Sequence, residues 1–389
     1  MTNSMSGKQR MMTAFGLQEA DHVPVAPDIS AMVPVRLSGI PFDQAFLDGR
    51  PHNGYASATV AEAYVDAVKY YGMDGWYIYG SLPEILSPDR PQWENSYRPR
   101  DGGGQIRSRR ASTPYGELCM ETIYFADEPP WDSERPIKDL KRDWPRLRSM
   151  LGENEDWHWE TNFSDQARIG ENGVYSISIG IPQDWWFFQR NGGYSVMFYE
   201  YKDEPEAIQE IINFYTRFAL ARLKAILAAR PDEVMLGGSA SSLSASNLKY
   251  FKKYDLPFIQ QAARLCKEAG VFSHLHVCGK SRKIAELVAE ETEVSIIEPL
   301  EELPGGDVDI ASYKKRYGDR ICLKGNINTF EFLMTATPAQ VEEKAKRLID
   351  TCAPGGGFVL STGDQCGRDT PDANIFKLVE VASTYGAYH

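Results

Sequence analysis

The stretch FSHLHVCGK, residues 272–280, is a short run of apolar and aromatic residues that ends at a glycine. A run of this kind, closed by a turn residue, is typical of a buried β-strand. Seven further runs of the same type occur along the chain: VPVAPDIS from Val23, DGWYIYGS from Asp74, VYSISIGIP from Val174, EVMLGGSAS from Glu233, VSIIEPL from Val294, ICLKGNIN from Ile321 and GFVLSTGDQ from Gly357. The sequence therefore predicts eight strands.

Segments with a helical period separate these runs, for example residues 195–229 and 244–270. The pairs Thr337-Pro338 and Thr370-Pro371 are typical helix starts. Because parallel strands need a crossover long enough to hold a helix, this alternation predicts a parallel α/β sheet. Eight strand–helix units favour a (β/α)8 TIM barrel over an open doubly wound sheet. No GxGxxG or GxxxxGK loop follows an early strand, which argues against dinucleotide and NTP binding.

The second and third predicted strands are far apart, because their runs start at Asp74 and Val174. The intervening residues 81–173 are rich in proline and tryptophan, as in FADEPPWDSERP. We expect a single barrel domain over residues 1–389, with residues 81–173 as an insertion after the second strand that packs on the barrel.

The composition excludes several classes of protein. The 389 residues carry a formal charge of −12, which argues against a nucleic-acid-binding protein. No stretch approaches the roughly 18 apolar residues of a membrane span, and the first residues lack the apolar core of a signal peptide. We expect a cytoplasmic enzyme with no membrane partner; a homodimer is left open.

The ends of the predicted strands carry a set of metal-binding side chains. Strand alternation puts His276 and Cys278 on one face, Glu298 ends the sixth run, and Cys366 follows the eighth. In a barrel these positions surround one mouth. Two thiolates, an imidazole and a carboxylate suit tetrahedral zinc and argue against magnesium or calcium. The other cysteines, and His274, are interpreted as core residues: Cys119, Cys266, Cys322 and Cys352.

Other polar and aromatic residues follow the strands. Asp28, Asn326 and Asp364 are candidate catalytic residues, and Gln365 is a candidate substrate-binding residue, although each is also compatible with a turn or a cap. The aromatic residues Tyr79, Trp185 and Trp186 either line a substrate pocket or cover the core under the insertion.

Three stretches carry a family resemblance: KQRMMTAFGLQEADHVPVAP at the start, LKGNINTFEFL, and PGGGFVLSTGDQCGRDTPDANIFKLVEVA. They resemble the uroporphyrinogen decarboxylase superfamily over most of the chain except residues 81–173. The resemblance implies a (β/α)8 barrel independently of the strand count. True decarboxylases of this family carry an arginine-rich N-terminal motif, whereas VPVAPDISAMVPVRLSG here offers only Arg36.

The other branch of the superfamily comprises zinc-dependent, corrinoid-linked methyltransferases. Their signature, His-x-Cys followed far downstream by Cys, matches His276, Cys278 and Cys366, and Glu298 lies where a more distant relative, cobalamin-independent methionine synthase, has a glutamate. The wording STGDQCGRDTP resembles the substrate-side methyltransferases of aryl-ether O-demethylases. The resemblance implies transfer of a methyl group from a small methoxylated substrate to Co(I) of a separate corrinoid protein.

Alternatives remain open at this point. The direction could be reversed, with methylcobalamin methylating a thiol that zinc activates. A metal-independent decarboxylase is a second alternative. A corrinoid-binding module is disfavoured, because the DxHxxG string of base-off cobalamin domains is missing.

Overall fold

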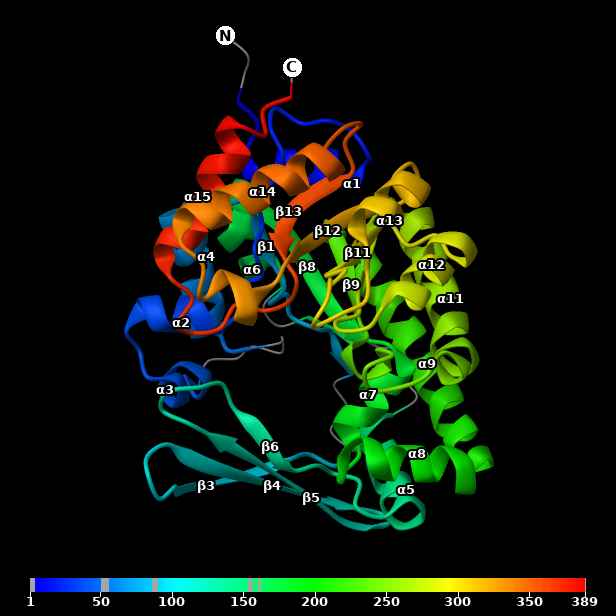
Figure 1. The fold of residues 1–389 in the computed structure, drawn as a ribbon. Helices are drawn as coiled ribbons and strands as arrows, with labels where there is room; N and C mark the ends of the chain where they lie inside the picture. Colours follow the sequence, from blue (N-terminus) through cyan, green and yellow to red (C-terminus); the bar gives the residue numbers. More distant parts are fainter. Residues whose placement is uncertain (1–3, 50–55, 86–89, 153–156, 160–161, 389) are drawn as a thin grey trace.

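The computed structural model describes residues 4–49, 56–85, 90–152, 157–159 and 162–388 (Figure 1). Its centre is a curled, parallel, seven-stranded sheet in the order β1-β8-β9-β10-β11-β12-β13. The bounds are β1 Gly75–Tyr77, β8 Gly173–Gly180, β9 Glu233–Gly237, β10 Phe272–His276, β11 Ile296–Glu298, β12 Cys322–Ile327 and β13 Phe358–Thr362. These are seven of the eight predicted runs, in sequence order across the sheet.

Helices connect and cover these strands, as parallel pairing requires. The α-helices of the described residues are α1 Gly7–Phe15, α2 Met32–Ser38, α3 Phe42–Phe46, α4 Ala58–Tyr71, α5 Leu140–Leu151, α6 Asn162–Ile169, α7 Pro182–Gln189, α8 Gly193–Asp203, α9 Pro205–Ala228, α10 Leu248–Tyr250, α11 Leu256–Ala269, α12 Arg282–Glu291, α13 Ile310–Tyr317, α14 Pro338–Cys352 and α15 Asp372–Thr384. None of them is both long and apolar enough to cross a membrane.

The remaining run, from Val23 and the first along the chain, forms no extended strand but lies between the two edges of the sheet. Val25 pairs with Leu360 of β13 in a single parallel bridge, and the amide of Ala26 donates to the carbonyl of Leu360 over 2.9 Å. On its other side, the carbonyl of Val25 accepts from the amide of Asp74, directly before β1, over 2.9 Å. The segment therefore bridges β13 and β1. Asp74 also accepts from the amide of Val25 over 2.9 Å and forms a buried ion pair with Arg10.

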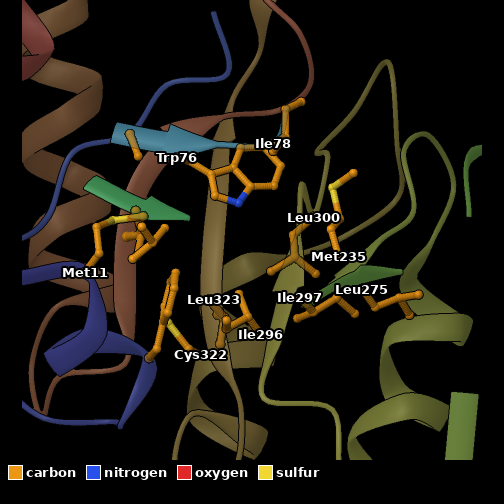
Figure 2. Close-up of a cluster of buried hydrophobic side chains, with 14 of the residues drawn as sticks. Met11, Trp76, Ile78, Met235, Leu275, Ile296, Ile297, Leu300, Cys322 and Leu323 are labelled. Atoms are coloured by element: carbon orange, nitrogen blue, oxygen red, sulfur yellow. The ribbon is translucent and has the colours of Figure 1, made fainter. Parts of the chain in front are cut away.

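Alternation along the strands separates two environments. Leu275, Ile297 and Leu323 belong to the large apolar core that the helices cover, and Figure 2 shows part of this cluster around Trp76. On β10, His274 and His276 point to the opposite side from Leu275. The interior of the curled sheet therefore contains charged and aromatic groups as well as apolar ones.

Between β1 and β8 the chain forms a second sheet, antiparallel, in the order β3-β4-β5-β6. Its strands are β3 Glu94–Pro99, β4 Gln105–Thr113, β5 Gly116–Tyr124 and β6 Trp131–Glu134, and β2 Glu84–Ile85 pairs with β7 Trp157–His158. In Figure 1 this sheet lies across from α2 and α3, beyond the ends of the parallel strands. Buried Arg190 after α7 attaches it, because its guanidinium donates to the carbonyls of Ile137 (2.9 Å) and Lys138 (3.0 Å) and pairs with Glu200.

The helical period of residues 195–229 is confirmed, and the stretch forms α8 and α9, which meet where Pro205 starts α9. Two local predictions were wrong. Thr337 caps α14 with a full capping box, but Thr370 caps nothing: Pro371 occupies the N-cap of α15 and gives no side-chain cap. Cys119 is only partly buried on β5, whereas the other three cysteines assigned to the core are buried.

Candidate active site

His276 and Glu298 are the last residues of β10 and β11 and are direct partners in the sheet register. Nδ1 of His276 lies 2.9 Å from Oε1 of Glu298. A carboxylate on Nδ1 fixes the ring orientation and favours the tautomer in which Nε2 is free to bind a metal. The structure therefore makes Glu298 a partner of the predicted histidine ligand.

The other oxygen of Glu298 pairs with Lys324 of β12, and both side chains are buried. The ammonium of Lys324 also lies 3.6 Å from the centre of the Trp76 ring. Burial raises the pKa of Glu298, but the charges of Lys324 and His274 and the bond to His276 outweigh it and hold the pKa well below its usual value. Glu298 is thus an ionised acceptor inside the sheet.

A second buried pair involves His274, which lies two residues before His276 on β10. Nδ1 of His274 is 3.1 Å from Oε2 of Glu233, and the indole of Trp76 donates to the same carboxylate. Nε2 of His274 is 3.9 Å from Glu298 and has no hydrogen bond among the described residues. His274 is therefore a buried core histidine that adjoins the site, as predicted.

Cys278 lies just beyond β10, next to two carboxylates. Its Sγ and one oxygen each of Glu301 and Asp364 all lie within 4.8 Å of one another. The amide of Gly279 donates to Glu301 and positions it. Burial raises the pKa of the Glu301 carboxyl. Three acidic donors so close together suit a cation.

His276 contacts this cluster through Cys278. Burial lowers the pKa of His276, but its hydrogen bonds to Cys278 and Glu298 outweigh burial and hold the pKa well above its usual value. Imidazole, thiol and carboxylate donors from β10, β11 and the loop after β13 therefore meet at one end of the sheet.

Cys366 is fully buried in the loop after β13, and its amide donates to the carbonyl of Asp28 over 2.7 Å. Burial raises the pKa of its thiol, and the hydroxyls of Thr362 and Thr370 beside it act in the opposite direction. Within the described part of the chain, neither Cys366 nor His276 belongs to the three-residue group around Cys278. The structure thus joins His276 to Glu298 and groups Cys278 with Glu301 and Asp364, and His276 adjoins that group through Cys278.

Asp28 and Asn326 are the other predicted polar residues at this end. Burial raises the pKa of Asp28 to about 6, Lys324 opposes this, and Glu298 and Asp364 add to it. Nδ2 of Asn326 donates to the carbonyl of Leu300 over 2.8 Å, while its Oδ1 is buried without a hydrogen-bond partner among the described residues. Gln365, between Asp364 and Cys366, is half-buried.

The three predicted aromatic residues lie in different surroundings: one lines a cavity and two are fully buried. Trp185 stacks on Tyr215 with ring centres 4.3 Å apart and lines a cavity of about 570 Å³ that reaches the end of β8. Trp186 is fully buried against Trp144, so the structure places it in the core rather than on a cavity wall. Tyr79 is also fully buried, with its ring edge against Tyr64.

Sequence reasoning missed Glu233, Lys324 and Glu301. Lys324 had a usable signal, because a lysine inside the run ICLKGNIN is rarely buried unless it is paired. Glu233 had a weaker signal, because it is a charged residue at the start of the apolar run EVMLGGSAS. Nothing in the spacing distinguished Glu301 from its neighbours in EPLEELP.

The family model described as uroporphyrinogen decarboxylase (URO-D) matches residues 190–385, just over half of the chain. The chain belongs to the uroporphyrinogen decarboxylase family. The matched residues include β10 to β13 and every predicted metal-binding residue, and the predicted superfamily is confirmed.

Among curated proteins, the chain is similar to the methylcobamide:CoM methyltransferase MtbA of Methanosarcina acetivorans, with 26% identity over 213 residues, 55% of this chain and 56% of the relative. It is also similar to uroporphyrinogen decarboxylase of Coxiella burnetii, 23% identical over 47% of this chain and 48% of the relative. The chain thus spans about half the length of these relatives.

Among solved structures, a methyltransferase from Methanosarcina mazei superposes with a TM-score of 0.65 over 98% of this chain and 99% of its own, at 15% identity. This likeness establishes the fold: a curled parallel sheet with helices.

Proposed function

We propose that this protein is a corrinoid-dependent methyltransferase, which moves a methyl group from a small methoxylated aromatic compound to Co(I) of a corrinoid on a separate protein. The observation that carries the proposal is the convergence of His276, Cys278 and Glu298 at the strand ends, within the half of the chain that is similar to methylcobamide:CoM methyltransferases.

We assign zinc to this site, with His276, Cys278 and Cys366 as ligands and Glu298 as the partner that orients His276. The donor set supports this, because imidazole and thiolate are ligands that zinc prefers. When bound, zinc supplies a Lewis acid that stabilises the negative charge developing on an ether oxygen as its methyl group leaves.

The chain's own residues bind and orient the substrate in this proposal. Trp185 on its cavity wall offers a flat apolar surface to an aromatic ring. Asp28, Asn326 and Asp364 are the candidate catalytic residues that would contact the reacting groups, and Tyr79 and Gln365 remain candidates for substrate binding. Asn326 has the strongest support, because its buried Oδ1 lacks a partner within the described residues.

A second candidate reverses the direction, so that the methyl group passes from a methylcobamide to a thiol. The names of the MtbA relatives favour it. A metal-independent decarboxylase is less well supported, because Arg36, the one arginine in the corresponding N-terminal stretch, is already paired with Asp372.

The deciding experiment measures both directions with the same preparation. Cob(I)alamin with 4-methoxybenzoate is followed for methylcob(III)alamin formation by its visible spectrum, and methylcobalamin with 2-mercaptoethanesulfonate is followed for loss of that spectrum. Activity in the first assay, with about one zinc per chain that Cys278→Ser removes, supports the proposal. Activity in the second alone supports the reverse reaction, and CO2 release without zinc rejects both.

We also infer that the segment around Val25 acts as the eighth strand of a closed (β/α)8 barrel, and that residues 81–173 are an insertion within one domain. The bridge to Leu360 and the bond from Asp74 support closure. Residues 1–3 and 389, at the ends of the predicted domain, lie outside the described residues. Three predictions stay untested: that a corrinoid protein is the partner, that the chain can form a homodimer, and that the protein is cytoplasmic.

A further inference from the structure

The antiparallel sheet has one covered face and one open face. Arg107, Arg109 and Ala111 alternate along β4 and share a face. On that face Ala111 pairs with Leu118 of β5, and both are buried in an apolar cluster with Trp144. Arg107 and Arg109 therefore lie on the covered side of the sheet.

The arginines of the two faces differ in their partners. On the open face, Arg98 pairs with Glu121 at 2.9 Å and Arg110 with Glu117 at 3.3 Å. Among the described residues, the guanidinium groups of Arg107 and Arg109 make neither an ion pair nor a hydrogen bond, and the Nε atom of each is buried. The two less exposed arginines, Arg107 and Arg109, are thus the ones that lack an ion pair.

Aromatic rings pack against these two cations. The guanidinium carbon of Arg107 lies 5.1 Å from the centre of the Tyr124 ring, and that of Arg109 lies 5.5 Å from the centre of the Trp93 ring. Burial lowers the pKa of Arg109, and the neighbouring charge of Arg107 acts in the same direction. Ring contacts orient the cations but do not neutralise them.

A cavity of about 640 Å³ lies in front of both arginines, lined on its other sides by Trp131, Phe188 and residues 47–49, 56 and 57. Its two carboxylates already have partners. Asp132 accepts from the hydroxyl of Thr122 over 2.7 Å, and Asp48 accepts from the amide of Thr59 over 2.7 Å. Asp132 keeps its charge and acts on Arg109 from a distance, but among the described residues neither arginine has an ion pair, so the cavity wall offers positive charge beside aromatic surface.

This cavity adjoins the one that reaches the parallel sheet. Arg109, Asp132 and Phe188 line both, and the second continues to Trp185 and Gly180 at the end of β8. A molecule held at Arg107 and Arg109 would thus lie on the side of the insertion that faces the ends of the strands (Figure 1).

We propose that Arg107 and Arg109 bind the oxyanion of a small aromatic molecule in this cavity. A carboxylate, sulfonate or phosphate would supply the missing counter-charge and accept charge-assisted hydrogen bonds from both guanidiniums. A cation without an ion pair is costly to bury, so an anionic ligand accounts for the two arginines on the covered face. The inference stands on the cavity alone and does not depend on methyl transfer.

The test is calorimetric titration of the full chain with benzoate, benzenesulfonate and phenyl phosphate, next to the uncharged isostere benzamide and inorganic phosphate. We expect at least one aryl oxyanion to bind about tenfold or more tighter than both controls. Arg107→Met and Arg109→Met should each weaken that binding about tenfold, the size of one charge-assisted contact, while Arg110→Met on the open face changes it less than about twofold. Binding that survives Arg107→Met and Arg109→Met together, or no preference over benzamide, overturns the proposal.

A second measurement separates ligand binding from a structural role. If the two cations await a ligand, ligand-free Arg109→Met melts at or above the wild-type temperature, because an unpaired buried charge has been removed. The aryl oxyanion then raises the melting temperature of the wild type and not of the variant. A variant that melts well below the wild type overturns the proposal. Neither readout involves cobalamin or zinc, so failure here is distinct from failure of the methyl-transfer assay.

Discussion

Nδ1 of His276 lies 2.9 Å from Oε1 of Glu298, and the two residues are exact neighbours in the register of β10 and β11. One hydrogen bond thus connects adjacent strands at the site and directs the other ring nitrogen of His276 away from Glu298. The orientation of the histidine is set by the sheet itself and not by a loop.

Glu298→Gln is expected to weaken zinc binding about 10- to 100-fold, the usual effect of losing the carboxylate behind a metal-binding histidine. The amide is isosteric but no longer charged. Competition with a chromogenic chelator measures the affinity, and Glu286→Gln, at a half-buried position of α12, is the control. An unchanged affinity would mean that His276 does not bind the metal.

Lys324→Met should lower the free energy of unfolding by about 3–5 kcal/mol, because it leaves the Glu298 carboxylate buried without its cation. Denaturant titration measures this, and adding Glu298→Gln should recover part of the loss. The exposed pair Arg347 and Glu343 supplies the control, since Arg347→Met should cost about 0.5 kcal/mol or less. If Lys324→Met and Arg347→Met lower the free energy of unfolding equally, the buried pair contributes no more than the exposed one.

Cys366→Ser should remove zinc from the purified protein, as should Cys278→Ser. Cys352→Ser is a matched control, because Cys352 is also fully buried but lies at the end of α14 in the apolar core. Elemental analysis gives the zinc content per chain. If Cys366→Ser keeps its metal while Asp364→Asn loses it, the ligands are instead the group of Cys278, Glu301 and Asp364.

Asp255 gives a prediction about pH. It is fully buried, accepts from the amide of Gln183 over 2.9 Å, and burial raises its pKa to about 7. Since the folded pKa exceeds the unfolded value of about 3.9, the folded state binds the proton more tightly, and stability falls as pH rises from about 4 to 7.

Across that range the wild type should therefore lose about 3 kcal/mol relative to Asp255→Asn, which does not titrate. Denaturant midpoints at pH 5, 6, 7 and 8 check the trend. Asp101→Asn, in an exposed turn, should run parallel to the wild type. A pH-independent difference between wild type and Asp255→Asn would show that Asp255 does not titrate between pH 5 and 8 in the folded protein.

The strands and their order were predictable because each is a short apolar run with a turn residue at its end, and the pairing of consecutive parallel strands follows from the crossovers. The segment at Val23 has the same composition, yet it makes only one bridge. Its prolines at 24 and 27 lack the amide hydrogens that a regular strand requires.

At the site, His276, Cys278 and Glu298 could be placed together because they occupy strand ends whose geometry is known. Glu301 and Cys366 lie in loops, where spacing in sequence does not determine distance. The pairing of Lys324 with Glu298 depends on which residues of neighbouring strands lie side by side in the sheet, and only the register supplies that. The composition could not predict the two arginines of β4 that lack an ion pair, because the chain is acidic overall and has carboxylates in excess.

The contact between the segment at Val25 and β13 has a consequence for biosynthesis. Its partners, including Val25 with Leu360 and Asp28 with Cys366, are more than 330 residues apart in the chain. The residues up to β13 must therefore be synthesised before the segment at Val25 can meet that strand, and loop-closure entropy opposes the meeting. During translation the segment at Val25 can pair with Asp74 early, but its side toward β13 stays unpaired until β13 is made, and an unpaired strand edge is prone to association. The environment of Cys366 forms only after that contact is complete.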